Sequence, residues 1–292
     1  MGHQLARRTS AALSGLGRRS GMVVALAALA LLAGCSAQTQ DEWRNLAMPE
    51  PATEQAQHIF ELWRWSWVAA MATGVVVWGL IFWVVVRYRR KHDDEIPVQT
   101  RYNLPLEIFY TVAPIVMVIV FFYHTVDVQN AVLEDTEQDR TIEVVGQQWS
   151  WTFNHRLDGE DGPVVYTSGA GGNIPTLVLP VGETIQFNLH SPDVIHDFGV
   201  PAFLMKMDVI PGRVNHYEVT TDTEGTFAGK CYELCGSYHS RMLFEVQVVS
   251  VEDYESYLQD LEAQGNTAEE PLLGGSNAET PAGLDTGEEE PE

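Results

Sequence analysis

Cysteine and basic residues are both scarce in this chain of 292 residues. Three cysteines are too few for a disulfide framework, which excludes the small disulfide-rich secreted class. Only 17 Lys and Arg residues stand against 40 Asp and Glu residues, and the formal net charge is −23. This balance argues against nucleic acid as a partner and favours a basic protein instead. Solubility alone also accounts for most of the charge.

The chain also lacks a C-x-x-C-H motif, the usual attachment site of a c-type haem. Its length of 292 residues allows one or two domains. What the sequence does contain is a set of apolar runs in its first half, a stretch with strand periodicity, and one short segment dense in sulfur and imidazole donors.

The first 34 residues are typical of a bacterial secretion signal. An apolar run from Met22 to Leu32 follows a basic region and is too short to span a bilayer. It ends in Leu32-Ala33-Gly34-Cys35, which resembles a lipobox. We therefore predict a signal peptide over residues 1–34 and lipidation of Cys35, which would become the mature N-terminus. The alternative is that Cys35 belongs to an ordinary cleavage region.

Residues 35–60 are polar and are predicted to form a linker, and residues 61–126 a transmembrane helix hairpin. The two apolar runs, Leu62 to Val86 and Leu104 to His124, have the length of about 20 residues that a spanning helix needs. A basic cluster directly after the first run places the loop between the runs in the cytoplasm. The N-terminus and the chain after the second run then lie outside. A buried soluble hairpin is the alternative, and the charge asymmetry argues against it.

Residues 127–263 are predicted to form an all-β domain. From Thr141 onward apolar and polar residues alternate at period two in short segments, and Gly, Pro, Asn and Asp turns separate them. Many short strands favour a β-sandwich or barrel. A short helix is predicted over Val251–Ala263, and the tail 264–292 is expected to be disordered. The predicted strands are Thr141–Val145, Thr176–Leu179, Thr184–Leu189, Val214–Thr220 and Leu243–Val249.

The loop from Cys231 to Met242 concentrates metal-binding side chains. Cys231, Cys235, His239 and Met242 follow one another at spacings of four, four and three, which suits a tight loop with converging side chains. Thiolate, imidazole and thioether donors select copper over magnesium or calcium. His196 adds a further donor, and a second thiolate that can bridge suggests two copper ions. A disulfide between the two cysteines is the main alternative, and zinc is disfavoured because Met is a poor zinc ligand.

Three segments together resemble subunit II of the haem–copper cytochrome c oxidases: the Cys231–Met242 loop, Asp193-Val194-Ile195-His196, and Ile210-Pro211-Gly212-Arg213. The resemblance covers about residues 60 to 250 and implies a cupredoxin-like Greek-key barrel that holds a dinuclear copper A centre. It implies one set of ligands, in which Cys231 and Cys235 bridge the ions, His196 and His239 each bind one, Met242 is a weak axial ligand, and Glu233 binds through its backbone carbonyl.

The resemblance also implies roles for residues outside the copper loop. Trp149 matches the aromatic residue where electrons enter from cytochrome c, whereas Trp151, on the same strand, is expected in the core. Ser150 stands where many family members have an aromatic residue. Glu107 matches the mouth of a proton channel into subunit I, although an interfacial carboxylate gives the same pattern. The Glu233 carboxylate would share a magnesium or manganese ion with subunit I.

The sequence thus predicts subunit II of a bacterial respiratory cytochrome c oxidase, a multi-pass protein of the cell membrane. The resemblance implies that it takes electrons from cytochrome c or from a membrane-bound c-type cytochrome. It would pass them to haem in subunit I, where oxygen is reduced to water with proton pumping, and subunit III is a further implied partner. An acidic surface would steer a basic donor, with an association rate that falls as salt rises.

Other protein classes fit part of the pattern. A quinol oxidase subunit II shares the two spans and the barrel, but its family pattern lacks the copper ligands that are present here. A membrane-anchored copper chaperone combines a C-x3-C motif with a distal His, but such proteins usually resemble thioredoxin and have one span. Nitrous-oxide reductase carries a similar copper loop beside a His-rich domain. This chain is too short for such a domain and, with nine His, too poor in histidine.

Overall fold

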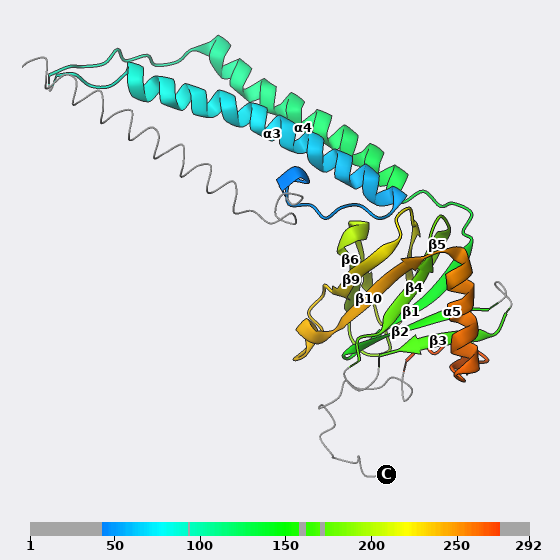
Figure 1. Ribbon diagram of the computed structural model, residues 1–292. Coiled ribbons are helices and arrows are strands. Elements are labelled where there is room, and N and C mark those ends of the chain that lie inside the picture. The colour runs from blue at the N-terminus through cyan, green and yellow to red at the C-terminus, as the bar shows by residue number, and fades with distance from the viewer. Residues whose placement is uncertain (1–42, 93, 158–161, 170–172, 275–292) are drawn as a thin grey trace, which may run out of the picture. The chain divides into compact units, whose positions relative to one another are not determined.

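The computed structural model describes residues 43–92, 94–157, 162–169 and 173–274, and Figure 1 labels its main elements. Cys35 and the predicted signal peptide lie outside the described residues. Within these residues, two long helices are followed by a β domain of two sheets and a further helix. The predicted fold class, a helix hairpin followed by an all-β cupredoxin-like domain, is thereby confirmed.

The two long helices, α3 (Glu54–Arg87) and α4 (Leu104–Val132), are long and apolar enough to cross a membrane. Helix α3 begins within the stretch predicted as linker, because the Thr53 side chain accepts a hydrogen bond from the Ala56 amide at 3.2 Å and caps it. Helix α4 continues past His124 because no Gly or Pro interrupts the sequence before Val132. Both helices therefore extend beyond their apolar runs.

The chain just before α3 is hydrogen-bonded to the β domain. The Ala52 amide donates to the Ala202 carbonyl at 2.9 Å, and the Asp222 amide donates to the Ala52 carbonyl at 3.2 Å. The Thr220 amide donates to the Gln55 side chain at 2.9 Å. Ala52 is 1% exposed, so this segment is part of the domain core rather than a free linker.

The β domain consists of a six-stranded and a five-stranded sheet, with two parallel strand pairs, β1 with β5 and β4 with β10. Burial alternates along β5 and β10, so each strand turns one face toward the core. The first sheet has the order β11 (Thr267–Ala268), β3 (Val164–Ser168), β2 (Ser150–Arg156), β1 (Arg140–Gln147), β5 (Thr184–His190) and β8 (Asn215–Thr220). The second has the order β4 (Thr176–Pro180), β10 (Leu243–Val249), β9 (Gly225–Cys231), β6 (His196–Val200) and β7 (Met205–Val209).

An aromatic cluster fills the core between the sheets. The rings of Phe198 and Phe244 stack with their centroids 4.8 Å apart. Trp151 meets both edge-on, at 5.5 and 5.4 Å, and is fully buried, as predicted. Its indole nitrogen donates to the Met242 carbonyl at 3.4 Å. The core is therefore joined directly to the end of the Cys231–Met242 loop.

Helix α5 (Val251–Ala263) covers part of the domain and has the bounds predicted for it (Figure 1). The Ser250 side chain caps it by accepting from the Asp253 amide at 3.1 Å. The helix buries Tyr254, Leu258 and Leu261 in a second apolar cluster with side chains from β3 and β4.

His155 is fully buried in this second region, where its Nδ1 lies 3.0 Å from the Tyr254 hydroxyl. Burial and the nearby charge of Arg140 lower its pKa from 6.5 to about 3, so the folded protein holds it neutral. The unfolded chain protonates this side chain below its ordinary pKa of 6.5. The neutral histidine therefore contributes stability above that pH, and the contribution is lost as the pH falls toward 3.

As the pH falls from about 7 to about 5, we expect the free energy of unfolding to decrease less in the variant His155→Gln than in the wild type, because glutamine does not titrate. Glutamine can still hydrogen-bond the Tyr254 hydroxyl, so that group need not be left unpaired. Urea unfolding of the full-length chain at several pH values measures the effect. Equal pH dependence in the two proteins would contradict it.

Candidate metal centre

The donor side chains come from adjacent strand ends. His196 opens β6, Cys231 ends β9, and Met242 directly precedes β10. Strands β6 and β9 are paired, with Phe198 opposite Cys231, so the start of β6 lies beside the end of β9. The antiparallel pairing of β9 with β10 closes the loop that carries the remaining donors.

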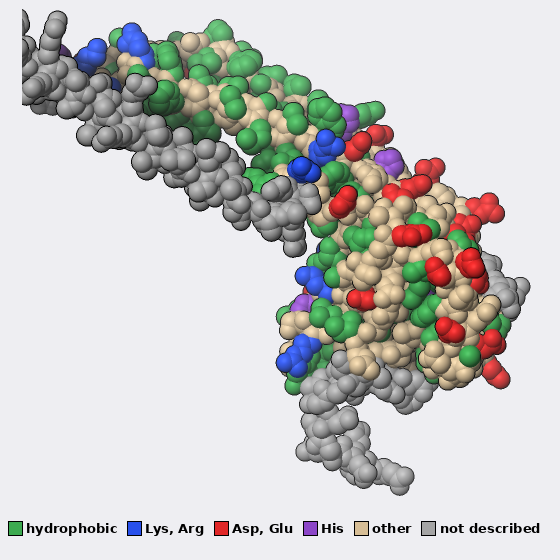
Figure 2. Space-filling view, in the orientation of Figure 1, with side chains coloured by type: hydrophobic (Ala, Val, Ile, Leu, Met, Phe, Trp, Pro, Cys, Tyr) green, Lys and Arg blue, Asp and Glu red, His purple; other side chains and the backbone are tan. Residues whose placement is uncertain are grey.

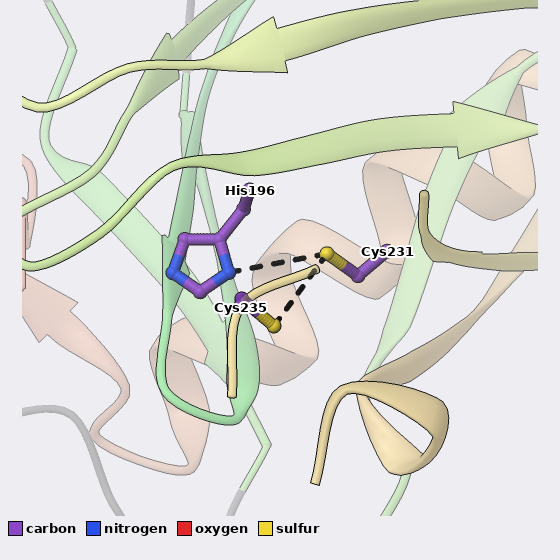
Figure 3. Close-up of side chains that lie close together, drawn as sticks. All are labelled: His196, Cys231 and Cys235. Carbon is purple, nitrogen blue, oxygen red and sulfur yellow. Dashed lines mark hydrogen bonds between the residues drawn. The ribbon is translucent and has the colours of Figure 1, made fainter. Parts of the chain in front are cut away.

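The five predicted donor side chains converge (Figure 3 shows three of them). The two sulfurs of Cys231 and Cys235 are 3.8 Å apart, and His196 Nδ1 lies 3.9 Å from the Cys231 sulfur. His239 Nδ1 and Met242 Sδ lie 3.6 and 3.7 Å from the Cys235 sulfur. Because metal–sulfur and metal–nitrogen bonds are about 2.0–2.3 Å long, donors at these spacings can share an ion.

The predicted alternative of a disulfide does not describe this structure. Both thiols are free and buried, and their separation of 3.8 Å is far from the bonded sulfur–sulfur distance of about 2.05 Å. The reactive atoms of His196, Cys231 and Cys235 all lie within 4.8 Å of one another. The cluster has the form of a metal site rather than a crosslink.

Asp193 fixes the orientation of the first histidine. Its Oδ1 is 2.9 Å from His196 Nε2, which leaves Nδ1 facing the thiols. Its Oδ2 accepts from the Gln148 amide at 2.8 Å. A carboxylate on the far nitrogen of a ligating histidine is the usual arrangement in metal sites. The spacing of three residues between Asp193 and His196 is the sequence signal from which this positioning role could have been predicted.

One backbone carbonyl of the loop lies close to a thiol, and another accepts hydrogen bonds from side chains beside the loop. The Cys231 sulfur lies 3.2 Å from the Glu233 carbonyl oxygen, whereas the Glu233 side chain is exposed. The Cys235 carbonyl accepts from the Gln148 side chain at 2.6 Å and from the Trp149 indole at 3.2 Å. No local sequence pattern predicted the Gln148 contact.

The electrostatics of the cluster require a cation when its sulfurs are ionised. Burial lowers the pKa of His196 despite the opposing effect of Asp193. Burial, followed by the neighbouring Cys231 thiol, raises the pKa of Cys235 to about 12. Two thiolates this close and this buried are unfavourable without positive charge between them, and a bound metal ion supplies it. Soft sulfur and imidazole donors fit copper.

Trp149 and Glu107 lie in different settings. Trp149 is half-buried beside the cluster, and its ring meets Tyr238 edge-on with centroids 5.1 Å apart. Glu107 lies in the first turn of α4, where its carboxylate accepts from the Asn103 amide at 2.9 Å. The described contacts of Glu107 are those of a helix cap.

Comparison with known proteins identifies relatives that match most of the chain. Residues 173–249 match the model of the cytochrome c oxidase subunit II periplasmic domain. The chain is 47% identical to the "Probable cytochrome c oxidase subunit 2" of Streptomyces coelicolor, over 87% of this chain and 90% of that protein. It is 37% identical to cytochrome c oxidase subunit 2 of Mycobacterium tuberculosis, over 87% of this chain and 85% of that protein.

Among solved structures, the chain is similar to the periplasmic domain of subunit II of cytochrome oxidase of Bradyrhizobium japonicum. The identity is 28%, the TM-score is 0.39, and the match covers 44% of this chain and 97% of that one. The resemblance noted in the sequence is confirmed by the matched domain and the curated relatives. Together with the grouped His196, Cys231 and Cys235, it supports a copper site. The chain belongs to the cytochrome c oxidase subunit 2 family.

Proposed function

We propose that this chain receives electrons from a c-type cytochrome at a dinuclear copper A centre and delivers them to the haem-bearing subunit I of a respiratory oxidase. The observation that carries the proposal is the convergence of two thiols, two imidazoles and a thioether at separations of 3.6–3.9 Å. With the Glu233 carbonyl, these groups outnumber the four ligands of a tetrahedral ion. A donor set of this size suits two ions that share the thiolates.

Copper bound there would supply one-electron chemistry, and the protein's contribution is a rigid set of ligands. Cys231 and Cys235 would bridge, His196 and His239 would each bind one ion through Nδ1, and Met242 would be a weak ligand. Two hydrogen bonds restrain this ligand set from outside it: one joins Asp193 to His196, and the other joins the Trp151 indole to the Met242 carbonyl. Ligands fixed by strands move little when the charge of a bound ion changes.

Trp149 is the proposed point of electron entry. Its indole nitrogen donates to the carbonyl of Cys235, so the ring is hydrogen-bonded to the backbone of a proposed ligand. Its half-buried ring bridges the surface and the cluster. A donor docked over Trp149 and Tyr238 would be separated from the sulfurs by this one side chain and one carbonyl.

Two further roles rest on the family resemblance. The exposed carboxylate of Glu233 is proposed to share a magnesium or manganese ion with subunit I, since its carbonyl and its side chain face different surroundings. Glu107 is proposed as an entry point for protons. Its capping hydrogen bond to Asn103 places the carboxylate at the start of the second span, the end that the basic loop assigns to the cytoplasm.

The proposed topology puts the N-terminus and the copper domain outside the cytoplasm and both α3 and α4 across the membrane. Lipidation of Cys35 would add an anchor to the same face. The oxidase partners would be subunits I and III, and the donor would be cytochrome c or a membrane-bound c-type cytochrome. A quinol oxidase subunit or a copper chaperone does not account for the complete donor set together with Trp149.

The copper content of the full-length chain tests the proposal. We expect two coppers per chain and a mixed-valence paramagnetic spectrum in which one unpaired electron couples to both nuclei. The complete chain is required because the segment before α3 and the segment after α5 are both hydrogen-bonded to the β domain. One copper per chain, with coupling to one nucleus, would refute the dinuclear assignment.

A further inference from the structure

The post-α5 segment, residues 264–274, does not leave the domain but runs along the six-stranded sheet. The Tyr166 amide donates to the Asn266 carbonyl at 3.1 Å. Residues Thr267 and Ala268 form β11, an antiparallel edge strand on β3. These contacts lie within the stretch predicted to be disordered, and they show that its first part is anchored.

Asn154 holds the post-α5 segment a second time. Its Oδ1 accepts from the Leu272 amide at 2.8 Å, and its Nδ2 donates to the Leu272 carbonyl at 3.2 Å. Asn154 lies on β2 and is 2% exposed. It also donates to the Glu143 carbonyl on β1 at 3.1 Å. The segment therefore crosses from the edge strand β3 toward the middle of the sheet.

Hydrogen bonds rather than charge hold the post-α5 segment. It contains Glu269 and Glu270 but no Lys or Arg. Acidic side chains also gather on the α5 side of the domain, from which the segment departs (Figure 2). Its attachment therefore depends on the pairing with β3 and on the amide of Asn154, and it should change little with salt.

Gly274 brings the backbone of the post-α5 segment against the β5–β6 loop, residues 191–195. A Cβ at this position would lie 2.5 Å from Pro192 Cγ and 2.8 Å from Gln147 Oε1, so a larger residue fits only if these neighbours move. Pro192 directly precedes Asp193, and Gln147 directly precedes Gln148. The segment thus packs against two residues whose next neighbours in the chain belong to the surroundings of the metal centre.

Asp193 and Gln148 connect this contact to the proposed copper ligands. The Asp193 carboxylate lies 2.9 Å from His196 Nε2 and accepts from the Gln148 amide at 2.8 Å. The Gln148 side chain donates to the Cys235 carbonyl at 2.6 Å. A displacement of the residues that Gly274 contacts therefore reaches one imidazole ligand and the backbone of one thiol ligand.

We propose that the post-α5 segment supports the metal centre, and that Asn154 and Gly274 are positioning residues that hold the β5–β6 loop and, through Asp193, the imidazole of His196. The inference rests on the proposed function of this site, because it assigns residues to the support of its ligands. A ligand that is already held in place loses less conformational freedom when the ion binds. The segment should therefore slow the loss of copper.

The variant Gly274→Ala in the full-length chain tests this support, and Gly265→Ala is its matched control. Both glycines have a positive φ, of 103° and 82°, so alanine strains the backbone at both positions. At Gly274 the added Cβ meets Pro192 and Gln147, whereas at Gly265 nothing lies within 4 Å of it. The two variants therefore differ in the displacement of the β5–β6 loop.

The loss of copper(I) to the chelator bathocuproine disulfonate measures the effect. Loss of a group that directly supports a metal ligand costs about 10–100-fold in affinity, and Gly274 is one contact further away. We therefore expect copper loss to be about threefold to tenfold faster in Gly274→Ala than in Gly265→Ala. The ratio of the two rates should be the same at low and high salt, because hydrogen bonds hold the segment.

A spectroscopic signature separates this positioning role from general stability. The copper hyperfine coupling should shift in Gly274→Ala and keep its wild-type value in Gly265→Ala, because only the first variant moves the imidazole of His196. Asn154→Leu removes both hydrogen bonds to Leu272 and should shift the coupling in the same direction. Because Asn154 and Gly274 act through one segment, their effects on copper loss should not add in the double variant.

Hydrogen exchange in the copper-free chain measures the support without any metal. The amides of Gln148 and Val194 both donate to the Asp193 carboxylate, at 2.8 and 2.6 Å, and should exchange faster in Gly274→Ala than in Gly265→Ala. A wild-type chain that bound no copper would refute the proposed function and leave this readout intact. Equal exchange in the two variants would overturn the proposal, and so would faster exchange with unchanged copper loss and an unchanged spectrum.

Discussion

Replacing Cys231 with serine is expected to abolish the copper centre and to reduce cytochrome c oxidation by more than about a hundredfold. Loss of a group that only supports a metal ligand costs about 10–100-fold, and Cys231 is itself a proposed bridging ligand. Its sulfur lies 3.8 Å from the Cys235 sulfur and 3.9 Å from His196 Nδ1, so it touches both halves of the site. Without it the remaining donors cannot share two ions.

Copper analysis and the paramagnetic spectrum of the purified chain measure this effect directly. The matched control is Ser240→Ala, which changes an exposed residue in the same loop and should keep two coppers and full activity. Thermal unfolding of the copper-free proteins shows whether the fold survives, since serine is close to cysteine in size. A Cys231→Ser protein that retained two coppers and the mixed-valence spectrum would remove the bridging role.

The fold could be predicted where burial follows a regular period. Strands β5 and β10 alternate between buried and partly exposed positions, and the sequence shows that alternation. All residues of β6 are buried, so its short segment carries no period of two. Strand β9 contains two glycines and a lysine and does not resemble a strand in isolation. Both strands are held in place by their neighbours in the sheet rather than by local preference.

The candidate site could be predicted where its donors are contiguous. The Cys231–Met242 loop places its side chains together through short spacings, but the approach of His196 depends on the pairing of β6 with β9. That pairing joins residues far apart in the sequence and has no local signal. The hydrogen bonds of Gln148 and Trp149 to the Cys235 carbonyl likewise depend on how the loop packs against the start of β2.

The first part of the C-terminal tail, from residue 264 to residue 274, also differs from its prediction for a reason that is not local. Its composition, rich in Gly, Glu, Thr and Pro, predicts disorder because it offers little apolar surface to bury. Backbone pairing with β3 and the amide of Asn154 hold residues up to Gly274 without any such surface. Composition indicates how much apolar surface a segment can bury. It does not indicate whether an edge strand is available for backbone pairing with that segment.

Replacing Trp149 with leucine is expected to slow reduction of the copper centre by cytochrome c by about a hundredfold, the cost that misplacing one reacting group can reach. Leucine removes both the ring and the hydrogen bond to the Cys235 carbonyl. Trp149→Phe keeps an aromatic ring but loses this hydrogen bond, so its rate should lie between those of the wild type and Trp149→Leu. Trp149 supplies no ligand atom in the proposed cage, so both variants should keep two coppers and the wild-type spectrum.

Stopped-flow mixing of each oxidase with reduced cytochrome c measures the rate of electron entry, and Tyr232→Phe is the matched aromatic control. The Tyr232 ring lies beside Lys230, and the backbone amide, rather than the ring, joins it to Asp197, so its variant should react at the wild-type rate. If Trp149→Leu also reacted at that rate, electrons would enter elsewhere, although the copper assignment would stand. If Trp149→Leu lost its copper, the hydrogen bond of the indole would instead be a structural support of the ligand loop.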